Sequence, residues 1–319
     1  MSPCPKGCSR YPVASSGFQM PVAKIVRLRE NRPASRVRTT NQAGRRETPL
    51  KRCRTIFTYR ELLINLTRTE LRIKYKNSVL GFLWSLLNPV LYLVVFSLVF
   101  QEILRTQIPR FAIFLLAGLL VWNFFSTSLA SGALSIVANA SIVQKVWFPR
   151  EILPLASVGA AMVHFLLQAL VLVGALLLFR QEPDWEALAL LPLSLLALTL
   201  LAVAAALALA VLNVHYRDTQ HLLELVLLAW FWLTPIVYNH QLIADRLGSN
   251  DWVAMLNPIT SVVLAFQRAL HNPPPGYIPD VSLWMYARNT ALLTVVAFLL
   301  LAGSLRLFGH LEGDLTENI

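Results

Sequence analysis

The stretch LRIKYKNSVLGFLWSLLNPVLYLVVFSLVF, residues 71–100, joins a cationic segment to an apolar one. Arg72, Lys74 and Lys76 lie within its first six residues, whereas residues 79–100 carry no formal charge. A helix that crosses the hydrocarbon core of a bilayer needs about 20 apolar residues. The stretch therefore predicts a membrane span with a positively charged entrance.

The rest of the chain has the composition of a membrane protein. Of its 319 residues, 56% are hydrophobic and 14% are charged, whereas soluble domains hold about 25% charged residues. Apolar stretches recur along the sequence and predict an all-α polytopic protein with six transmembrane helices. We expect these spans near residues 79–104, 112–136, 152–179, 187–213, 222–240 and 286–307.

Positive charge is concentrated before the first span. Residues 1–80 hold 18 of the 28 Lys and Arg residues but 4 of the 17 Asp and Glu residues. Because Lys and Arg near a span stay in the cytoplasm, we expect the N-terminus there, and six spans return the C-terminus to the same side. Residues 1–54 lack hydrophobic periodicity and predict a disordered basic extension. A membrane domain is expected to follow at residues 55–319.

Two expected helices lie outside the six spans. An amphipathic helix is predicted to begin near Thr58, because Thr58 and Glu61 have the spacing of a capping box. It can lie in the headgroup layer, or it can pack on a soluble partner. Residues 257–270 are too short to cross a membrane, so they predict a re-entrant or interfacial helix on the outer face. Within the first span, Pro89 predicts a kink or break.

The spans contain few groups that carry chemistry. His164 is the ionisable side chain, Cys and Tyr aside, that lies deep in an expected span. We expect its imidazole to bond to another helix rather than to move protons. The chain has no Gly-Lys dipeptide, so it lacks the loop that holds nucleotide phosphates in many ATPases. These features favour a protein that is not an enzyme, binds no cofactor and draws any energy from another polypeptide.

Several motifs, in order, resemble the ABC-2 type permeases, the membrane subunits of O-antigen, capsule and teichoic-acid exporters. The resemblance covers residues 55–319 and rests on YKNSVLGFLWSLLNPVLYLVVF (75–96), GLLVWNFFSTSL (118–129), NASIVQKVWFPREILPLASV (139–158), LNVHYRDTQHLL (212–223), WFWLTPIVY (230–238), NPITSVVLAFQRAL (257–270) and the terminal FGHLEGDLTENI (308–319). It implies a homodimer in the bacterial cytoplasmic (inner) membrane, with two separate ABC ATPase subunits that bind ATP and Mg.

The same resemblance implies a substrate and leaves alternatives. The substrate would be a polysaccharide attached to a polyprenyl diphosphate lipid, with membrane lipid and no nucleic acid among the other partners. One alternative is an ABC-2 exporter of a small lipophilic compound. Another is a membrane glycosyltransferase or assembly protein. The sugar composition and length of the polymer do not follow from the sequence.

The loop between the second and third spans is a candidate site for coupling to the ATPase. Its two aromatic side chains can fill a pocket of a partner, and its charges can lie at the rim. The alternative is an ordinary loop whose aromatic residues anchor at the membrane interface. This coupling loop consists of Gln144, Lys145, Val146, Trp147, Phe148, Pro149, Arg150 and Glu151.

Two further candidate sites concern the substrate. Arg72, Lys74 and Lys76 can bind a lipid diphosphate where it enters, or they can serve as the topological signal alone. A second group of aromatic side chains can line a polymer channel by packing on sugar rings. Alternatively, these side chains can face lipid, pack between helices or anchor at the membrane interface. This group consists of Tyr92, Phe96, Phe100, Trp122 and Phe125.

Overall fold

The computed structural model describes residues 49–76, 83–103, 110–146, 148–238, 256–272, 278–279 and 282–311. The chain divides into two units, residues 1–43 and 44–319, and all of the described residues belong to the second unit. Within these residues the backbone forms helices and no strand. The all-α fold class is therefore confirmed.

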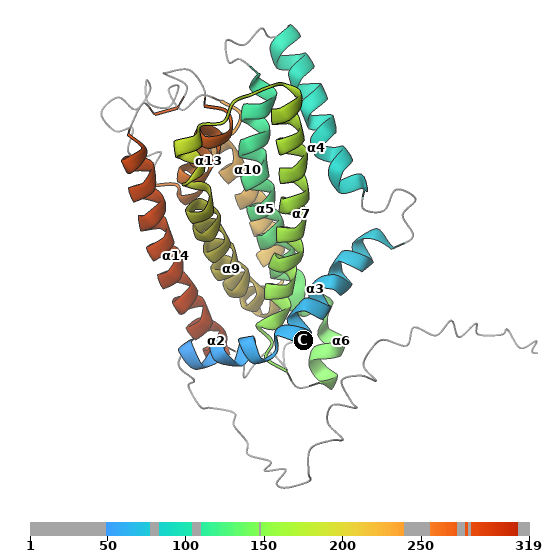
Figure 1. Cartoon of the computed structure of the whole chain (residues 1–319). Helices are drawn as coiled ribbons and strands as arrows, with labels where there is room; N and C mark the ends of the chain where they lie inside the picture. The colour runs from blue at the N-terminus through green and yellow to red at the C-terminus, as the bar shows by residue number, and fades with distance from the viewer. Residues whose placement is uncertain are drawn as a thin grey trace, which may run out of the picture. The chain divides into compact units, whose positions relative to one another are not determined.

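Four helical segments are long and apolar enough to cross a membrane (Figure 1). They are α5 (Phe111–Ala138), α7 (Ile152–Leu178), the segment Trp185–His215, which contains α8 (Trp185–Leu188) and α9 (Leu191–His215), and α14 (Leu283–Leu311). These four match the second, third, fourth and sixth expected spans. The first expected span contains α4 (Leu83–Phe96) and the π-helix η1 (Ser97–Ile103), and the fifth overlaps most of α10 (Thr219–Leu233). For α4 and α10, crossing the membrane stays a prediction.

Helix α5 packs against α7, α9 and the short helix α13 (Pro258–Leu270). Small residues allow its close approach to α9, since a Cβ atom added at Gly132 would lie 2.6 Å from the Cβ atom of Ala206. The buried side chain of Asn213 on α9 donates a hydrogen bond from Nδ2 to the Ala133 carbonyl, at 3.0 Å. Packing and hydrogen bonds of this kind hold helices together where water is absent.

Helix α9 presents small residues at a spacing of one helical turn. Ala202, Ala206 and Ala210 are fully buried and lie four residues apart, so they share one face of the helix. Helix α14 runs along α9 and packs against it. Helix α9 therefore packs against both α5 and α14.

The short helix α13 is buried along nearly its whole length, and it packs against α5, α8, α9 and α14. Asn257 accepts a hydrogen bond from the Ile259 amide at 3.1 Å and caps the helix. The Trp230 indole of α10 donates to the same oxygen at 2.9 Å. At the other end, Arg268 Nε lies 3.3 Å from Asp184 Oδ2. The helix is as short as the sequence predicts, and its re-entrant placement stays a prediction.

Two local predictions differ from the structure. Helix α2 (Pro49–Thr58) begins inside the segment expected to be disordered, and α3 (Arg60–Tyr75) follows it after one residue. Thr58 therefore ends α2, and its hydroxyl donates to the Arg54 carbonyl at 3.0 Å. The predicted capping box is wrong, because Thr58 is the last residue of α2 and does not cap the start of α3. Helix α4 continues through Pro89, so the helix is not broken there, and a kink at Pro89 stays a prediction.

Candidate functional site

The coupling loop connects α5 to α7 and includes the end of α6 (Ala140–Lys145). Phe148 is buried with 7% of its surface exposed. It belongs to an apolar cluster, called here the basal cluster, that joins the ends of α5, α9 and α14 to the start of α7. The basal cluster consists of Ile136, Val143, Phe148, Leu153, Leu207, Ala210, Val211, Val214, Leu305 and Phe308.

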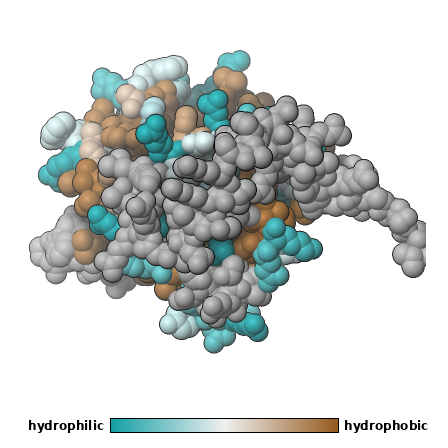
Figure 2. Space-filling model, turned by 90° about the horizontal axis from the view of Figure 1, so that it is seen from below, coloured by the Kyte–Doolittle hydropathy of each residue, from teal (hydrophilic) through white to brown (hydrophobic). Residues whose placement is uncertain are grey.

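The outer surface of the coupling loop is formed by its first residues. Gln144, Lys145 and Val146 are exposed, and Trp147 lies outside the described residues. This end of the molecule, where α2 and α6 lie, carries hydrophilic residues among hydrophobic ones when viewed from below (Figure 2). Phe148 packs within its own subunit, and its role in binding a partner stays a prediction.

The last residue of the coupling loop is tied to the N-terminal helix. Glu151 is 3% exposed and lies immediately before α7. Its carboxylate forms an ion pair and hydrogen bond with the Arg52 guanidinium of α2. Sequence reasoning missed this pair because Arg52 falls within the segment of disordered composition. One signal could have indicated the helix: Pro49 is its first residue, a position that proline favours.

The three candidate entrance cations lie at the end of α3. Arg72, Lys74 and Lys76 are all exposed. Helix α3 packs along α7 through polar contacts that the sequence pattern does not reveal. Thr67 donates to the Leu63 carbonyl at 2.9 Å and also lies 3.4 Å from the Ala156 carbonyl of α7. The three cations therefore lie at the end of a helix that is packed against α7.

Two titratable groups strengthen the contact between α3 and α7. The Ser157 hydroxyl of α7 donates to Glu70 at 2.7 Å. Burial raises the pKa of the Glu70 carboxyl, and this hydrogen bond acts in the opposite direction. Farther along, the Tyr75 hydroxyl lies 3.1 Å from Nδ1 of His164. The prediction that His164 bonds to another helix is thus confirmed, with α3 as its partner.

The aromatic candidates fall into two environments. Tyr92, Phe96 and Phe100 form a continuous stripe along α4 and η1, with successive ring centroids 5.8 Å apart. Tyr92 is 38% exposed. Trp122 and Phe125 are 7% and 1% exposed, and they pack edge-on against Phe231 and Trp230 of α10. Of the stripe, Tyr92 is exposed, whereas Phe96 and Phe100 are half-buried and pack against the core. A role of either group in a polymer channel stays a prediction.

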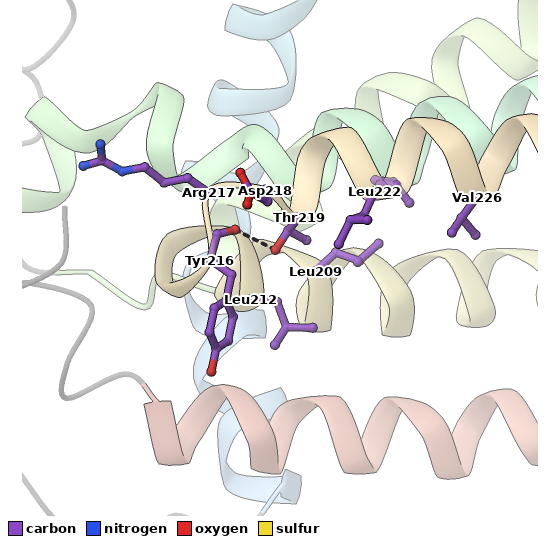
Figure 3. A pocket seen from close by; sticks show the side chains of 9 residues that line it. Leu209, Leu212, Tyr216, Arg217, Asp218, Thr219, Leu222 and Val226 are labelled. Atoms are coloured by element: carbon purple, nitrogen blue, oxygen red, sulfur yellow. Dashed lines mark hydrogen bonds between the residues drawn. The ribbon is translucent and has the colours of Figure 1, made fainter.

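A groove lies between the end of α9 and the start of α10 (Figure 3). Its volume is about 710 Å³, and leucine and valine side chains of both helices line most of it. Tyr216, Arg217 and Asp218 lie at one end, where the chain turns between the helices. The Thr219 hydroxyl donates to the Tyr216 carbonyl at 2.7 Å and closes this turn. Such a lining can hold a hydrocarbon chain but offers few hydrogen-bonding groups to a sugar.

The described part of the chain contains no group of three or more His, Cys, Asp or Glu residues that could hold a metal ion. The candidate site is made up of surfaces and packing contacts. It comprises an exposed loop end, a cationic helix end, an aromatic stripe and an apolar groove.

Comparison with known proteins assigns the chain to a family. The family model described as ABC-2 type transporter matches residues 61–270, more than half of the chain. An O-antigen export system permease protein RfbA of Myxococcus xanthus is 32% identical over 266 residues, covering 83% of this chain and 98% of the relative. A protein of the same name from Klebsiella pneumoniae is 28% identical over 257 residues, covering 81% and 94%. The chain belongs to the ABC-2 type transporter family and is a membrane permease of that family.

Proposed function

We propose that the chain is the membrane subunit of an ATP-driven exporter that moves a lipid-diphosphate-linked polysaccharide across the bacterial cytoplasmic membrane. The observation that carries the proposal is the match to O-antigen export permeases over nearly their whole length. The apolar helices and the missing phosphate-binding sequence support a conduit that takes its energy from a separate ATPase. We propose a homodimer with two ATPase subunits, and with both termini in the cytoplasm.

Deletion of the gene tests this proposal. Cells without the permease should accumulate lipid-linked polymer on the cytoplasmic face of the membrane, because synthesis continues and export stops. Enzymatic labelling of the polymer in intact and lysed cells separates the two faces. Loss of the polymer from both faces would contradict the proposal and favour a role in synthesis. Unchanged surface polymer together with retention of a small lipophilic compound would favour the other transport function.

The exposed end of the coupling loop is the proposed contact with the ATPase. Lys145 and Val146 can reach a partner, whereas Phe148 holds the loop in place from within. We expect the double variant Lys145→Glu and Val146→Asp to lose ATPase co-purification while the permease still inserts and melts at the wild-type temperature. Wild-type amounts of bound ATPase would contradict the assignment. The matched control is Glu182→Lys, which reverses an exposed charge in the turn after α7.

The cations and the aromatic stripe are the proposed substrate contacts. Arg72, Lys74 and Lys76 would attract the diphosphate group where the lipid enters, since phosphate binding by Arg and Lys is charge-assisted. Tyr92 and Phe96 would then pack on sugar rings that pass along α4. Glutamine at the three cationic positions should slow export and preserve insertion. Full export by that triple variant would leave the cations with the topological role alone.

A further inference from the structure

Arg52 occupies a position where three distant parts of the chain meet. It lies on α2, pairs with Glu151 at the start of α7, and contacts α14. The side chains of Arg52 and Glu151 are 12% and 4% exposed. An ion pair at this depth is poorly screened by salt, and removal of one partner leaves the other charge buried without its counterion.

Helix α14 leaves room for the Arg52 guanidinium at Gly309. A Cβ atom added at Gly309 of α14 would lie 2.8 Å from Nη2 of Arg52 and 2.9 Å from its Cζ atom. Real side chains do not approach so closely, so the hydrogen at Gly309 leaves the space that Arg52 fills. Arg52 therefore fits between the end of the coupling loop and the last turns of α14.

The coupling loop has two anchors of different chemistry. Phe148 holds it through apolar contacts in the basal cluster, and Glu151 holds it through charge. An apolar contact permits a side chain to slide, whereas a buried carboxylate paired with a guanidinium has a defined geometry. The charged anchor is therefore the better candidate for fixing where the loop stands relative to α14.

We propose that Arg52 is a positioning residue for energy coupling, holding the end of the coupling loop against α14 so that motion of the loop moves the membrane helices. This inference rests on the proposed function, because it needs the loop to contact an ATPase. It assigns a mechanical role to a helix that begins before the membrane domain expected from the sequence.

The test combines a structural and a functional measurement on the full chain in its complex with the ATPase. A spin label at Ser141→Cys, exposed on α6, reports the mobility of the helix that leads into the coupling loop when the native cysteines are replaced by serine. In liposomes, polymer exported per ATP hydrolysed reports coupling. Arg52→Gln should raise the label's mobility and lower the export ratio by about fivefold or more, within the usual range of coupling between sites.

Two variants control for simple destabilisation. Arg54→Gln removes an exposed positive charge from the same helix, and both measurements should stay at the wild-type value. Gly309→Val leaves both charges in place but crowds the guanidinium, and it should change both measurements in the same direction as Arg52→Gln. If Arg52→Gln does not fold, Arg52→Met with Glu151→Leu removes both charges at once, which proteins often tolerate, and the same changes are expected.

Unchanged label mobility in folded Arg52→Gln would overturn the proposal, as would an unchanged export ratio. The variant Lys145→Glu with Val146→Asp separates the two levels of inference. If that variant loses the ATPase while Arg52→Gln behaves as wild type, the assignment of the coupling loop is supported and the proposed role of Arg52 is rejected. If that variant binds the ATPase normally, the assignment of the loop fails, whatever the Arg52 variants show.

Discussion

Helices α4 and α5 are similar in chemistry and different in environment. Neither contains Asp, Glu, Lys or Arg. Helix α5 is buried along its length among α7, α9 and α13, whereas much of α4 is exposed, including Leu91 and Val94 at 55% and 60%. Absence of charge therefore identifies both as apolar helices, but it does not say which one forms the core of the subunit.

The difference follows from small residues. Helix α5 carries Gly118, Ala133 and Gly132, and its neighbours approach these positions closely. Helix α4 contains neither Gly nor Ala, and branched side chains cover its surface. Because lipid is as apolar as leucine, helices in a bilayer associate mainly where small residues permit close packing. The exposed face of α4 is thus free to meet lipid, a second subunit or substrate.

The largest difference in the free energy of unfolding should appear between variants that remove one aromatic ring from α5 and one from α4. Phe125→Ala on α5 leaves a cavity next to Trp230 and should lower the free energy of unfolding by about 3–5 kcal/mol. Tyr92→Ala on α4 removes an exposed ring and should cost less than about 1 kcal/mol, while export falls. Unfolding in mixed detergent micelles measures the free energy of unfolding of both variants. Equal losses of stability would mean that α4 is also a core helix.

Added bulk should distinguish buried from open positions. Gly132→Val forces a side chain against Ala206 and should lower the free energy of unfolding by about 1–3 kcal/mol. Gly174→Val is the matched control on α7, because a Cβ atom there meets nothing within 4 Å. Thermal melting of the purified variants checks both. A normal melting temperature for Gly132→Val would show that α5 and α9 are farther apart than described.

The contact between α3 and α7 should give the smallest effect, a dependence on pH. Burial raises the pKa of Glu70 above its ordinary value of 4.5. A carboxyl with a raised pKa stabilises the folded protein below its unfolded pKa, and that contribution is lost as pH rises through the folded pKa. Wild type should therefore lose stability relative to Glu70→Gln as pH rises from about 4.5. A difference in melting temperature that stays constant with pH would argue against a buried Glu70.

The sequence predicts the helices better than their neighbours. Long runs without charge locate α5, α7, α9 and α14, because the thickness of the bilayer sets the length of a span. The contacts of α3 were hidden because Thr67, Glu70 and Tyr75 each meet α7 about ninety residues away in the chain. No local pattern encodes such pairs.

In the candidate site, too, the sequence predicts the segments but not their contacts. The sequence indicates the coupling loop by its aromatic residues and charges, yet it does not distinguish Phe148, which faces inward, from Lys145, which faces outward. Lys145 ends the short helix α6 and Phe148 lies in the loop after it, and a helix of six residues is too short for its hydrophobic spacing to assign the two residues a side. Arg52 was missed because composition averaged over residues 1–54 conceals the short helix α2.

Reconstitution in liposomes tests the central claim most directly. The purified permease is incorporated with lipid-linked polysaccharide, and delivery of polymer to the opposite face is measured with and without the ATPase subunit and ATP. The account predicts delivery only when permease, ATPase and ATP are all present. Delivery by the permease alone would contradict it, because a chain with no phosphate-binding sequence would then be supplying its own driving force.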